Sequence, residues 1–381
     1  VTILTSFDER GIARVGYKEN IANTVLNLAK LCQESNMRGV VCSPHEVTEI
    51  KLDMKSMIPK ENVVVLVTND GYIKRVSSKA YQSNNEEPAM KPGDFIKNLF
   101  EVTTLDNILM FTNKGNYIFM PVHKIPEGKW KELGKHVNNV VSLSPEEQIV
   151  ASFIYEPDKE IISATKAGMI KRTKASDYEV SRTSKAISSM KLKEQDEVVS
   201  VIEATQDILT ISQNGYYCKF NKLEVPMVGV RGSGVKAMNL KDDAVVAVLA
   251  LDDAEYITLF TNQNTAKRIK VSELVETGRA KRGNTLMKKV KSTSYSIVNA
   301  FSTNPRSEIL YGNKNDAYEI KNSEIPIMDL QSTGSQFTKK EVLYASLKTS
   351  LEGKEKEVEE KTEQAEKKEE QVAFKLDDFK L

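Results

Sequence analysis

VVVLVTNDGYIKRV (residues 63–76) joins an apolar β-rich run, a tight polar turn and a second β-run that carries basic residues. The pattern returns as NILMFTNKGNYIFM from Asn107, IISATKAGMIKRT from Ile161, DILTISQNGYYCKF from Asp207, YITLFTNQNTAKRI from Tyr256 and EILYGNKNDAYEI from Glu308. The turn residues Gly71, Gly115, Gly168, Gly215, Asn264 and Asn315 follow one another at intervals of 44, 53, 47, 49 and 51 residues. A repeat of about 50 residues indicates a radial array or solenoid of similar units.

Each unit is predicted to be a β-hairpin, because Asn-Asp-Gly, Asn-Lys-Gly and Gln-Asn-Gly accept the positive φ of a tight turn. Residues 94–102, 196–204 and 243–251 are further strand candidates between the hairpins. A two-stranded unit must pack on its neighbours to be stable. Three or four strands in each of six radial repeats predict an all-β, six-bladed, propeller-like disc over residues 48–351.

Composition narrows the class of protein. The chain has 381 residues, 40% of them hydrophobic, with a mean hydropathy of -0.39, as in ordinary soluble domains. No apolar run is long enough for a membrane-spanning helix and no signal peptide is recognisable, so we expect no membrane partner. The three cysteines, Cys32, Cys42 and Cys218, show no CxxC spacing. Neither a disulfide framework nor a zinc site is expected, and a reducing cytoplasm is the predicted location.

The net charge of +1 is unevenly distributed. Residues 48–351 hold 42 basic and 37 acidic residues, whereas residues 352–381 hold 7 lysines and 11 acidic residues. One group of basic residues follows the hairpin turns: Lys74, Arg75, Lys171, Arg172, Lys174, Lys267, Arg268 and Lys270. A second group lies in the loops that follow: Arg231, Lys236, Arg279, Lys281 and Arg282.

These thirteen residues are the candidate DNA contacts. In a radial array equivalent positions share one face or rim, so the two groups would form a curved basic band that suits bent duplex DNA. The alternative for any one lysine is that it keeps a strand edge from pairing with another chain. The sixth unit carries Glu319 instead, so the band is not expected to close around the disc.

The residues from Glu49 onward resemble a known family. EIKLDMKSMIPKENVVVLVTNDGYIKRVS from Glu49 and YIFMPVHKIPEGKWKELGKHVNNVVSLSPEEQIVASF (residues 117–153) are similar to the C-terminal β-pinwheel domain of bacterial type IIA topoisomerases, specifically of the topoisomerase IV A subunit. The resemblance runs to about residue 347. It implies a disc that binds and bends a DNA segment, presents it to a catalytic core and exchanges a strand between adjacent blades.

The resemblance also sets expectations for activity. The gyrase A subunit is less similar, because the loop YQSNNEEPAMKPGD from Tyr81 lacks the Gln-Arg-Arg-Gly-Gly box of that relative. The Gly-rich loop VGVRGSGVK from Val228 is interpreted as a blade connector, and the alternative is that it is a remnant of that box. No tyrosine follows an arginine as the family's DNA-cleaving tyrosine does, and no DxD metal cluster or phosphate-binding loop is recognisable. We therefore expect no catalysis and no cofactor in this chain. Mg²⁺ and ATP would serve other parts of the enzyme, and the implied partners are duplex DNA, the topoisomerase IV catalytic core and its B subunit.

Two other function classes compete with this one. A protein-interaction propeller would show an apolar or mixed face and a neutral rim, with Trp130 as the residue that could anchor it. Its neighbours Lys129, Lys131 and Lys135 favour a connector that lies against the disc. An enzyme, either a decarboxylase or a complete strand-passing machine, would need catalytic residues that the chain does not show.

Residues 1–47 do not follow the repeat. VTILTSFDE and RGVVCSPHE predict strands on either side of an amphipathic helix, NIANTVLNLAKLCQESN. Its apolar face is expected to hold Ile21, Val25, Leu28 and Leu31, extended by Leu26, Ala29 and Cys32. The sequence VLNLAKLCQESNMRGVVCSPHEV resembles bacterial orotidine 5′-phosphate decarboxylase around the fifth and sixth strands of its barrel. This resemblance would place Ser43 near the pyrimidine base of the substrate. One β-α-β unit cannot close that barrel, so we expect a fusion or a chimeric reading frame with a junction near Val47 and no decarboxylase activity.

Residues 352–381 form a Lys/Glu-rich segment for which disorder is predicted. Phe374, Leu376, Phe379 and Leu381 give it a short apolar motif, a candidate to dock on a partner or on the disc itself.

Overall fold

The computed structural model describes residues 8–35 and 58–353, except 145, 182, 205, 291–292, 314–315 and 341. The chain divides into two compact units, Val1–Glu61 and Asn62–Leu381. The junction predicted near Val47 lies outside the described residues. No described helix is both long and apolar enough to cross a membrane.

The first unit contains α1 (Glu9–Arg14) and α2 (Ile21–Glu34). Asp8 caps α1, because its Oδ1 accepts a hydrogen bond of 2.6 Å from the Gly11 amide. The predicted amphipathic helix is confirmed as α2, with Val25 and Ala29 buried. Leu31 was wrongly placed on the apolar face, since its side chain is 56% exposed. Glu9, assigned to a strand, begins α1; the rest of that strand and the second predicted strand fall mainly among residues outside the description.

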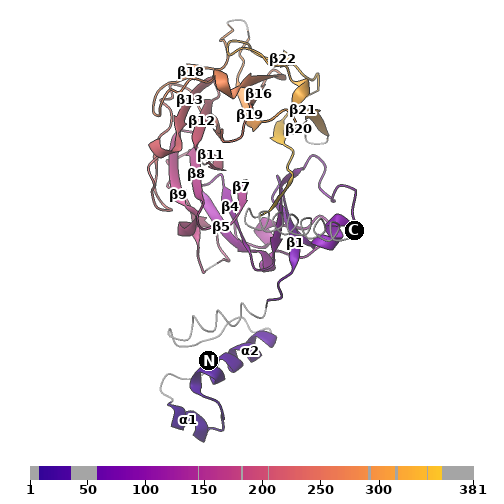
Figure 1. The fold of residues 1–381 in the computed structure, drawn as a ribbon, viewed down its shortest axis with the longest axis vertical. Helices are drawn as coiled ribbons and strands as arrows, with labels where there is room; N and C mark the ends of the chain where they lie inside the picture. The colour runs from indigo at the N-terminus through magenta and orange to yellow at the C-terminus, as the bar shows by residue number, and fades with distance from the viewer. Residues whose placement is uncertain are drawn as a thin grey trace, which may run out of the picture. The chain divides into compact units, whose positions relative to one another are not determined.

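The second unit is a ring of six small sheets, seen face-on in Figure 1. Each blade contains a hairpin and an inner strand. The hairpins are β1 (Asn62–Thr68) and β2 (Tyr72–Ser77), β4 (Asn107–Thr112) and β5 (Asn116–Pro121), β8 (Glu160–Thr165) and β9 (Met169–Lys174), β12 (Asp207–Ser212) and β13 (Tyr216–Asn221), β16 (Tyr256–Thr261) and β17 (Thr265–Lys270), and β20 (Glu308–Gly312) and β21 (Ala317–Lys321). The inner strands are β3 (Ile96–Thr103), β7 (Ile149–Ile154), β11 (Val198–Glu203), β15 (Val245–Ala250), β19 (Ile297–Thr303) and β23 (Tyr344–Leu347). The predicted all-β, six-bladed disc is confirmed.

A short strand from each following blade completes the first five sheets. These exchanged strands are β6 (Lys135–His136), β10 (Ile187–Ser188), β14 (Val235–Lys236), β18 (Asn284–Thr285) and β22 (Ser335–Gln336). Each pairs antiparallel with the outer hairpin strand of the preceding blade, as when β6 pairs with β2. The strand exchange implied by the family resemblance is therefore present.

Short helices join the strands. They are α4 (Ser78–Gln82), η1 (Val122–Lys124), η2 (Val137–Asn139), η3 (Ala175–Tyr178), η4 (Lys222–Glu224), η5 (Val271–Glu273) and η6 (Asn322–Glu324). After five of the six hairpins, one 3-10 turn leads into an extended segment that contains the exchanged strand. We call these segments the outer connectors: residues 126–136, 180–188, 226–236, 275–285 and 326–336.

The turn chemistry explains why the hairpins form. The predicted turn residues have positive φ, from 54° at Asn264 to 85° at Gly71, where residues other than glycine and asparagine are strained. Asn315 lies outside the described residues.

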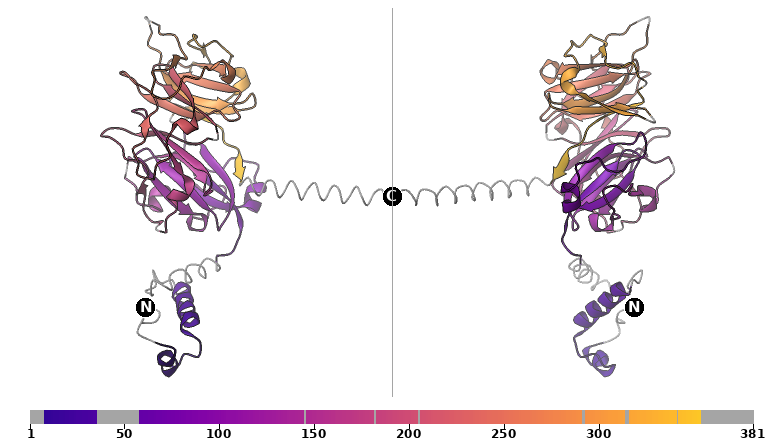
Figure 2. Two further views of the ribbon diagram at one scale, coloured as in Figure 1. Left: turned by 60° about the vertical axis from the view of Figure 1, so that its left-hand side comes forward. Right: turned by 90° about the vertical axis from the view of Figure 1, so that its right-hand side faces the viewer.

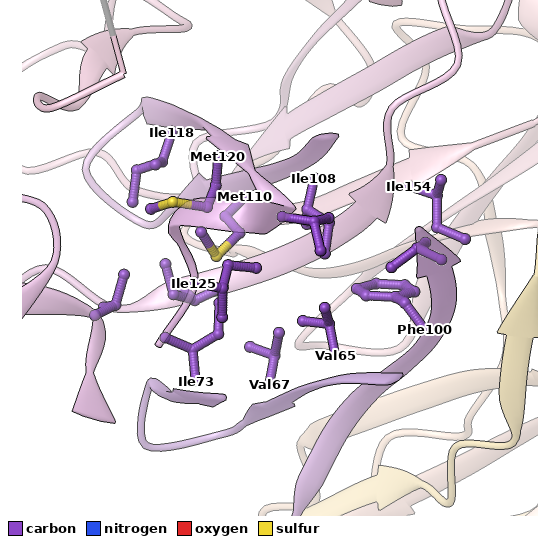
Figure 3. Close-up of a cluster of buried hydrophobic side chains, with 14 of the residues drawn as sticks. Val65, Val67, Ile73, Phe100, Ile108, Met110, Ile118, Met120, Ile125 and Ile154 are labelled. Atoms are coloured by element: carbon purple, nitrogen blue, oxygen red, sulfur yellow. The ribbon is translucent and has the colours of Figure 1, made fainter. Parts of the chain in front are cut away.

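The blades pack through apolar faces. Figure 3 shows Val65, Val67 and Ile73 of blade 1 facing Ile108, Met110 and Ile118 of blade 2. These side chains alternate along their strands and fill one face of the hairpin, and the other face of β1 is buried as well, through Val64 and Leu66. Burial between neighbouring sheets is thus the main stabilising term for a unit that could not stand alone.

The ring closes between blades 6 and 1. The yellow end of the chain runs from blade 6 back to the purple blade 1 (Figures 1 and 2), where β24 (Leu351–Gly353) pairs parallel with β3. The rings of Phe95 and Tyr344 stack with centroids 4.8 Å apart. Residues 352 and 353, assigned to the tail from sequence, therefore belong to the disc, and residues 354–381 lie outside the description.

Candidate nucleic-acid interface

The lysines of the repeated Lys-Arg pairs lie inside the disc. Lys74, Lys171 and Lys267 stand on the outer hairpin strands of blades 1, 3 and 5, with 0%, 0% and 2% of their surface exposed. Nζ of Lys74 donates to the carbonyl oxygens of Trp130 at 2.7 Å and Glu132 at 2.5 Å. Each ammonium is thus solvated by backbone carbonyls rather than by water.

The other two lysines make the same type of contact. Nζ of Lys171 donates to the carbonyl of Ser189 and lies 3.4 Å from that of Val230. Nζ of Lys267 donates to the carbonyls of Leu286 at 2.7 Å, Asp329 at 2.8 Å and Ser332 at 2.8 Å. Burial lowers the pKa of all three lysines to about 8. The three side chains anchor outer connectors of the next blade.

The arginines of the pairs fasten the beginning of the same connectors. Nε of Arg75, Arg172 and Arg268 lies 2.9, 3.1 and 2.5 Å from the carbonyl oxygens of Ile125, Val225 and Ile325, respectively. Arg75 also pairs with Glu127 at 3.2 Å, and Arg172 with Glu160 at 3.1 Å. Arg268 is 8% exposed and lies over the Tyr256 ring.

The prediction that the hairpin pairs contact phosphates is therefore wrong for Lys74, Lys171, Lys267 and Arg268. A phosphate could reach these groups only after the connectors leave the sheets. Arg75 and Arg172 have side chains 18% and 11% exposed, and their guanidinium groups already hold carbonyl and carboxylate oxygens.

A two-blade repeat underlies this arrangement. The outer connectors that receive Lys74, Lys171 and Lys267 begin at Pro126, Pro226 and Pro326 and reach Gly134, Gly234 and Gly334. The spacing of 100 residues in both series is visible in the sequence. It marks pairs of blades, in which the odd member supplies the Lys-Arg pair and the even member supplies the connector.

The exposed basic residues lie instead on the outer connectors and at two strand ends. Of the predicted contacts, Lys174, Arg231, Lys236, Lys270, Lys281 and Arg282 are exposed and Arg279 is partly exposed. Nη1 of Arg279 lies 2.6 Å from the carbonyl oxygen of Lys236, which joins the connectors of blades 4 and 5. Arg282 stacks on the Tyr216 ring, with Cζ 4.5 Å from the centroid.

Several exposed lysines were not among the predicted contacts. Lys129, Lys131 and Lys135 lie on the connector that covers blade 1, and Lys185 on the one that covers blade 2. Connector membership, read from the two-blade spacing, was the signal that could have found Lys129, Lys131 and Lys135, whereas the connector of Lys185 lies outside that series. Connector 326–336 contains Asp329 and no basic residue, so the row of exposed cations runs along the outer edges of blades 1 to 4.

Trp130 does not provide an anchor for a protein partner. Its side chain is 6% exposed, packs edge-on against Tyr81 and donates Nε1 to the Glu86 carbonyl at 2.7 Å. The Gly-rich loop from Val228 is a connector, as interpreted, because Val235 pairs with Ile170. Within the described ranges, no group of three His, Cys, Asp or Glu side chains could hold a metal ion.

Comparison with known proteins agrees with this geometry. The family model described as "DNA gyrase C-terminal domain, beta-propeller" matches residues 62–85, 106–155, 159–204, 206–252 and 255–304. These segments are the repeats of blades 1 to 5 and make up more than half of the chain. The chain belongs to the DNA gyrase C-terminal domain family.

The relatives within the family are topoisomerase subunits. The A subunit of DNA topoisomerase 4 from Bacillus subtilis (strain 168) is 36% identical over 325 residues, which are 83% of this chain and 40% of the relative. The Staphylococcus epidermidis (strain ATCC 12228 / FDA PCI 1200) protein of the same name is 38% identical over 260 residues, 66% of this chain and 32% of the relative. The chain spans less than half the length of these curated relatives.

Solved structures of the family have the same fold. The crystal structure of the C-terminal domain of DNA topoisomerase IV shares 33% identity with a TM-score of 0.72, covering 76% of this chain and 94% of that one. The DNA gyrase A C-terminal domain shares 22% identity with a TM-score of 0.57 over 75% of this chain and 99% of that one, a likeness in fold alone. The resemblance inferred for the disc is confirmed, and the family match begins at residue 62, so the decarboxylase resemblance of residues 1–47 stays a prediction.

Proposed function

We propose that the disc binds duplex DNA along its outer connectors and bends it toward the catalytic core of a topoisomerase IV. The observation that carries the proposal is the row of exposed cations along the outer edges of blades 1 to 4. Connector 226–236 holds Arg231 and Lys236 and no acidic residue, and its neighbour 275–285 adds Arg279, Lys281 and Arg282 beside one acidic residue, Glu276.

Such a row of cations is suited to contacts with the phosphate backbone of DNA rather than to readout of the base edges. Lysine and arginine side chains spread over a curved edge make many charge contacts with phosphates, which position a duplex without reading its sequence. The curvature of the edge would favour DNA that follows it, at a bending cost of a few kcal/mol that the added contacts offset. We further propose that the disc is part of a complete topoisomerase IV. In that enzyme it would assemble with a B subunit, the other parts would use Mg²⁺ and ATP, and the whole would act on the bacterial nucleoid.

Salt-dependent binding tests the proposal. We expect the full chain to bind a duplex of mixed sequence with an affinity that falls steeply between 50 and 200 mM salt, since about 0.9 counterions are released for each neutralised phosphate. Fluorescence transfer between the labelled ends of the duplex should rise on binding if the DNA is bent. An affinity that hardly changes with salt, or no affinity for duplex DNA, would reject the proposal.

A further inference from the structure

The outer edge of blade 6 differs from the other five. Sheets 1 to 5 each end on a strand exchanged from the next blade, whereas the blade-6 sheet has the order β21-β20-β23. Among the described residues, no strand pairs with the outer edge of β21. An edge strand of this kind is a template for a further strand.

The other blades show which backbone groups this edge offers. Arg268 on β17 receives the connector through both backbone groups: its amide donates to the Pro326 carbonyl at 2.9 Å, and its carbonyl accepts from the Met328 amide at 3.0 Å. Counting from the 3-10 turn that follows each hairpin, Glu319 occupies this position in β21. No described residue outside β20 bonds to its backbone, so its outward amide and carbonyl can receive a partner strand.

The side chains at this edge are partly apolar, and its charges are mixed, because the Glu319 carboxylate on β21 pairs with Nζ of Lys348 at 2.9 Å. Tyr318 and Ile320 of β21 are half-buried and alternate with the exposed Ala317, Glu319 and Lys321. The Tyr311 ring packs against Phe337 at 5.1 Å. Nζ of Lys340 lies 3.4 Å from the centre of the Tyr318 ring, which brings a cation to the edge. A strand with one apolar face and an acidic end complements such a surface.

We propose that residues 371–376 of this chain, Gln-Val-Ala-Phe-Lys-Leu, pair with the outer edge of β21 and complete blade 6. Val372, Phe374 and Leu376 alternate with Ala373 and Lys375, which is the pattern of a strand with one apolar face. Asp377 and Asp378 follow directly and supply the acidic end opposite Lys339 and Lys340.

The chain between β24 and the proposed strand is long enough to reach β21. β24 ends at Gly353 in the same compact unit as blade 6, and nineteen positions separate Gly353 from Val372. Nineteen residues reach on the order of 60 Å when extended. A domain of roughly 300 residues has a radius of gyration of about 19 Å, so the segment can reach any point on the disc. The intervening residues are mostly Lys and Glu and contain no proline.

Hydrogen–deuterium exchange of the β21 amides tests this pairing. The full chain should protect amides 317–321 at least tenfold more than a chain that ends at Glu370. A Phe374→Ser/Leu376→Ser variant should lose the protection, and Lys375→Ser, which changes the opposite face, should keep it. Fluorescence of Trp130, buried in blade 1 and the single tryptophan, reports that the disc stays folded in every variant.

Three results would overturn the proposal. Rapid exchange of amides 317–321 in the full chain would show an open edge. Protection that survives removal of residues 371–381 and grows with protein concentration would assign the edge to a second copy. Equal protection in Phe374→Ser/Leu376→Ser and Lys375→Ser would show that the apolar face is not what binds.

Discussion

Nζ of Lys171 lies 3.4 Å from the carbonyl oxygen of Val230, and the next residue, Arg231, is exposed on the outer connector over blade 3. A buried cation therefore holds the segment that presents an exposed cation. The Lys-Arg pairs thus position the connectors, and the exposed residues on those connectors are the candidate DNA contacts.

Replacing Lys171 by methionine should destabilise the disc by roughly 1–3 kcal/mol, because the carbonyls of Ser189 and Val230 lose a buried donor. Urea denaturation followed by circular dichroism measures the change. Lys174→Met on the same strand is the matched control, since Lys174 is exposed, and it should change stability by no more than about 0.5 kcal/mol. Equal effects at the two positions would contradict the anchoring role.

Neutralising the exposed connector residues should weaken DNA binding evenly across sequences. The variant Arg231→Gln/Lys236→Gln/Lys281→Gln is expected to lower the slope of log K against log salt by up to about 0.9 for each phosphate contact removed. Lys166→Gln/Arg306→Gln is the control, because both residues are exposed and lie outside the outer connectors. A control slope reduced as much as that of the connector variant would place the interface elsewhere.

The sequence predicted the hairpins well because local chemistry decides them. Apolar alternation and a turn residue that accepts positive φ, such as Gly71 or Asn264, are enough to specify two paired strands. Strand exchange was expected only from the family resemblance. β6 pairs with β2 although some sixty residues separate them, and no local pattern in Lys135 and His136 encodes that partner.

The site was predicted less well, since a lysine in a strand gives no sign of which way it points. Aligning the repeats would have helped: Lys74, Lys171 and Lys267 share their column with Ile118 and Cys218, both 0% exposed. An aligned repeat position that holds isoleucine in one blade and lysine in others is expected to be buried in all of them. Lysine fits it because the long apolar stem crosses the core and the ammonium meets a ring of carbonyls.

The stability of the disc should rise between pH 8 and 9.5 in part through these lysines. Burial lowers the pKa of Lys171 to about 8 from the ordinary 10.5, so over this range the unfolded chain binds more protons than the folded one. The free energy of unfolding then increases with pH. The difference in the free energy of unfolding between the wild type and Lys171→Met, measured by urea denaturation, should therefore be larger at pH 9.5 than at pH 7.5. Parallel pH profiles of the two proteins would contradict the assignment.

Gly283 should not tolerate a side chain. It has φ of 82°, and a Cβ there would lie 1.8 Å from the Tyr217 carbonyl oxygen, where the blade-5 connector meets blade 4. We expect Gly283→Ala to lower the free energy of unfolding by more than about 2 kcal/mol and to expose β13 to hydrogen exchange. Gly229→Ala is the matched control on another connector, since nothing lies within 4 Å of its Cβ position, and it should be close to neutral.

Ring closure should depend on the stacked pair Phe95 and Tyr344. An aromatic pair contributes about 0.5–1.5 kcal/mol beyond its buried area, so a double-mutant cycle of Phe95→Ala and Tyr344→Ala should show a coupling energy in that range. The Tyr344 hydroxyl is buried and makes no hydrogen bond to any described residue, and burial raises its pKa. Tyr344→Phe keeps the stacked ring and removes that unsatisfied group, so it should leave stability unchanged or raise it slightly. Urea denaturation of the wild type, the two single variants and the double variant measures the cycle; additive losses in the double variant would show that the stacked pair does not contribute to ring closure.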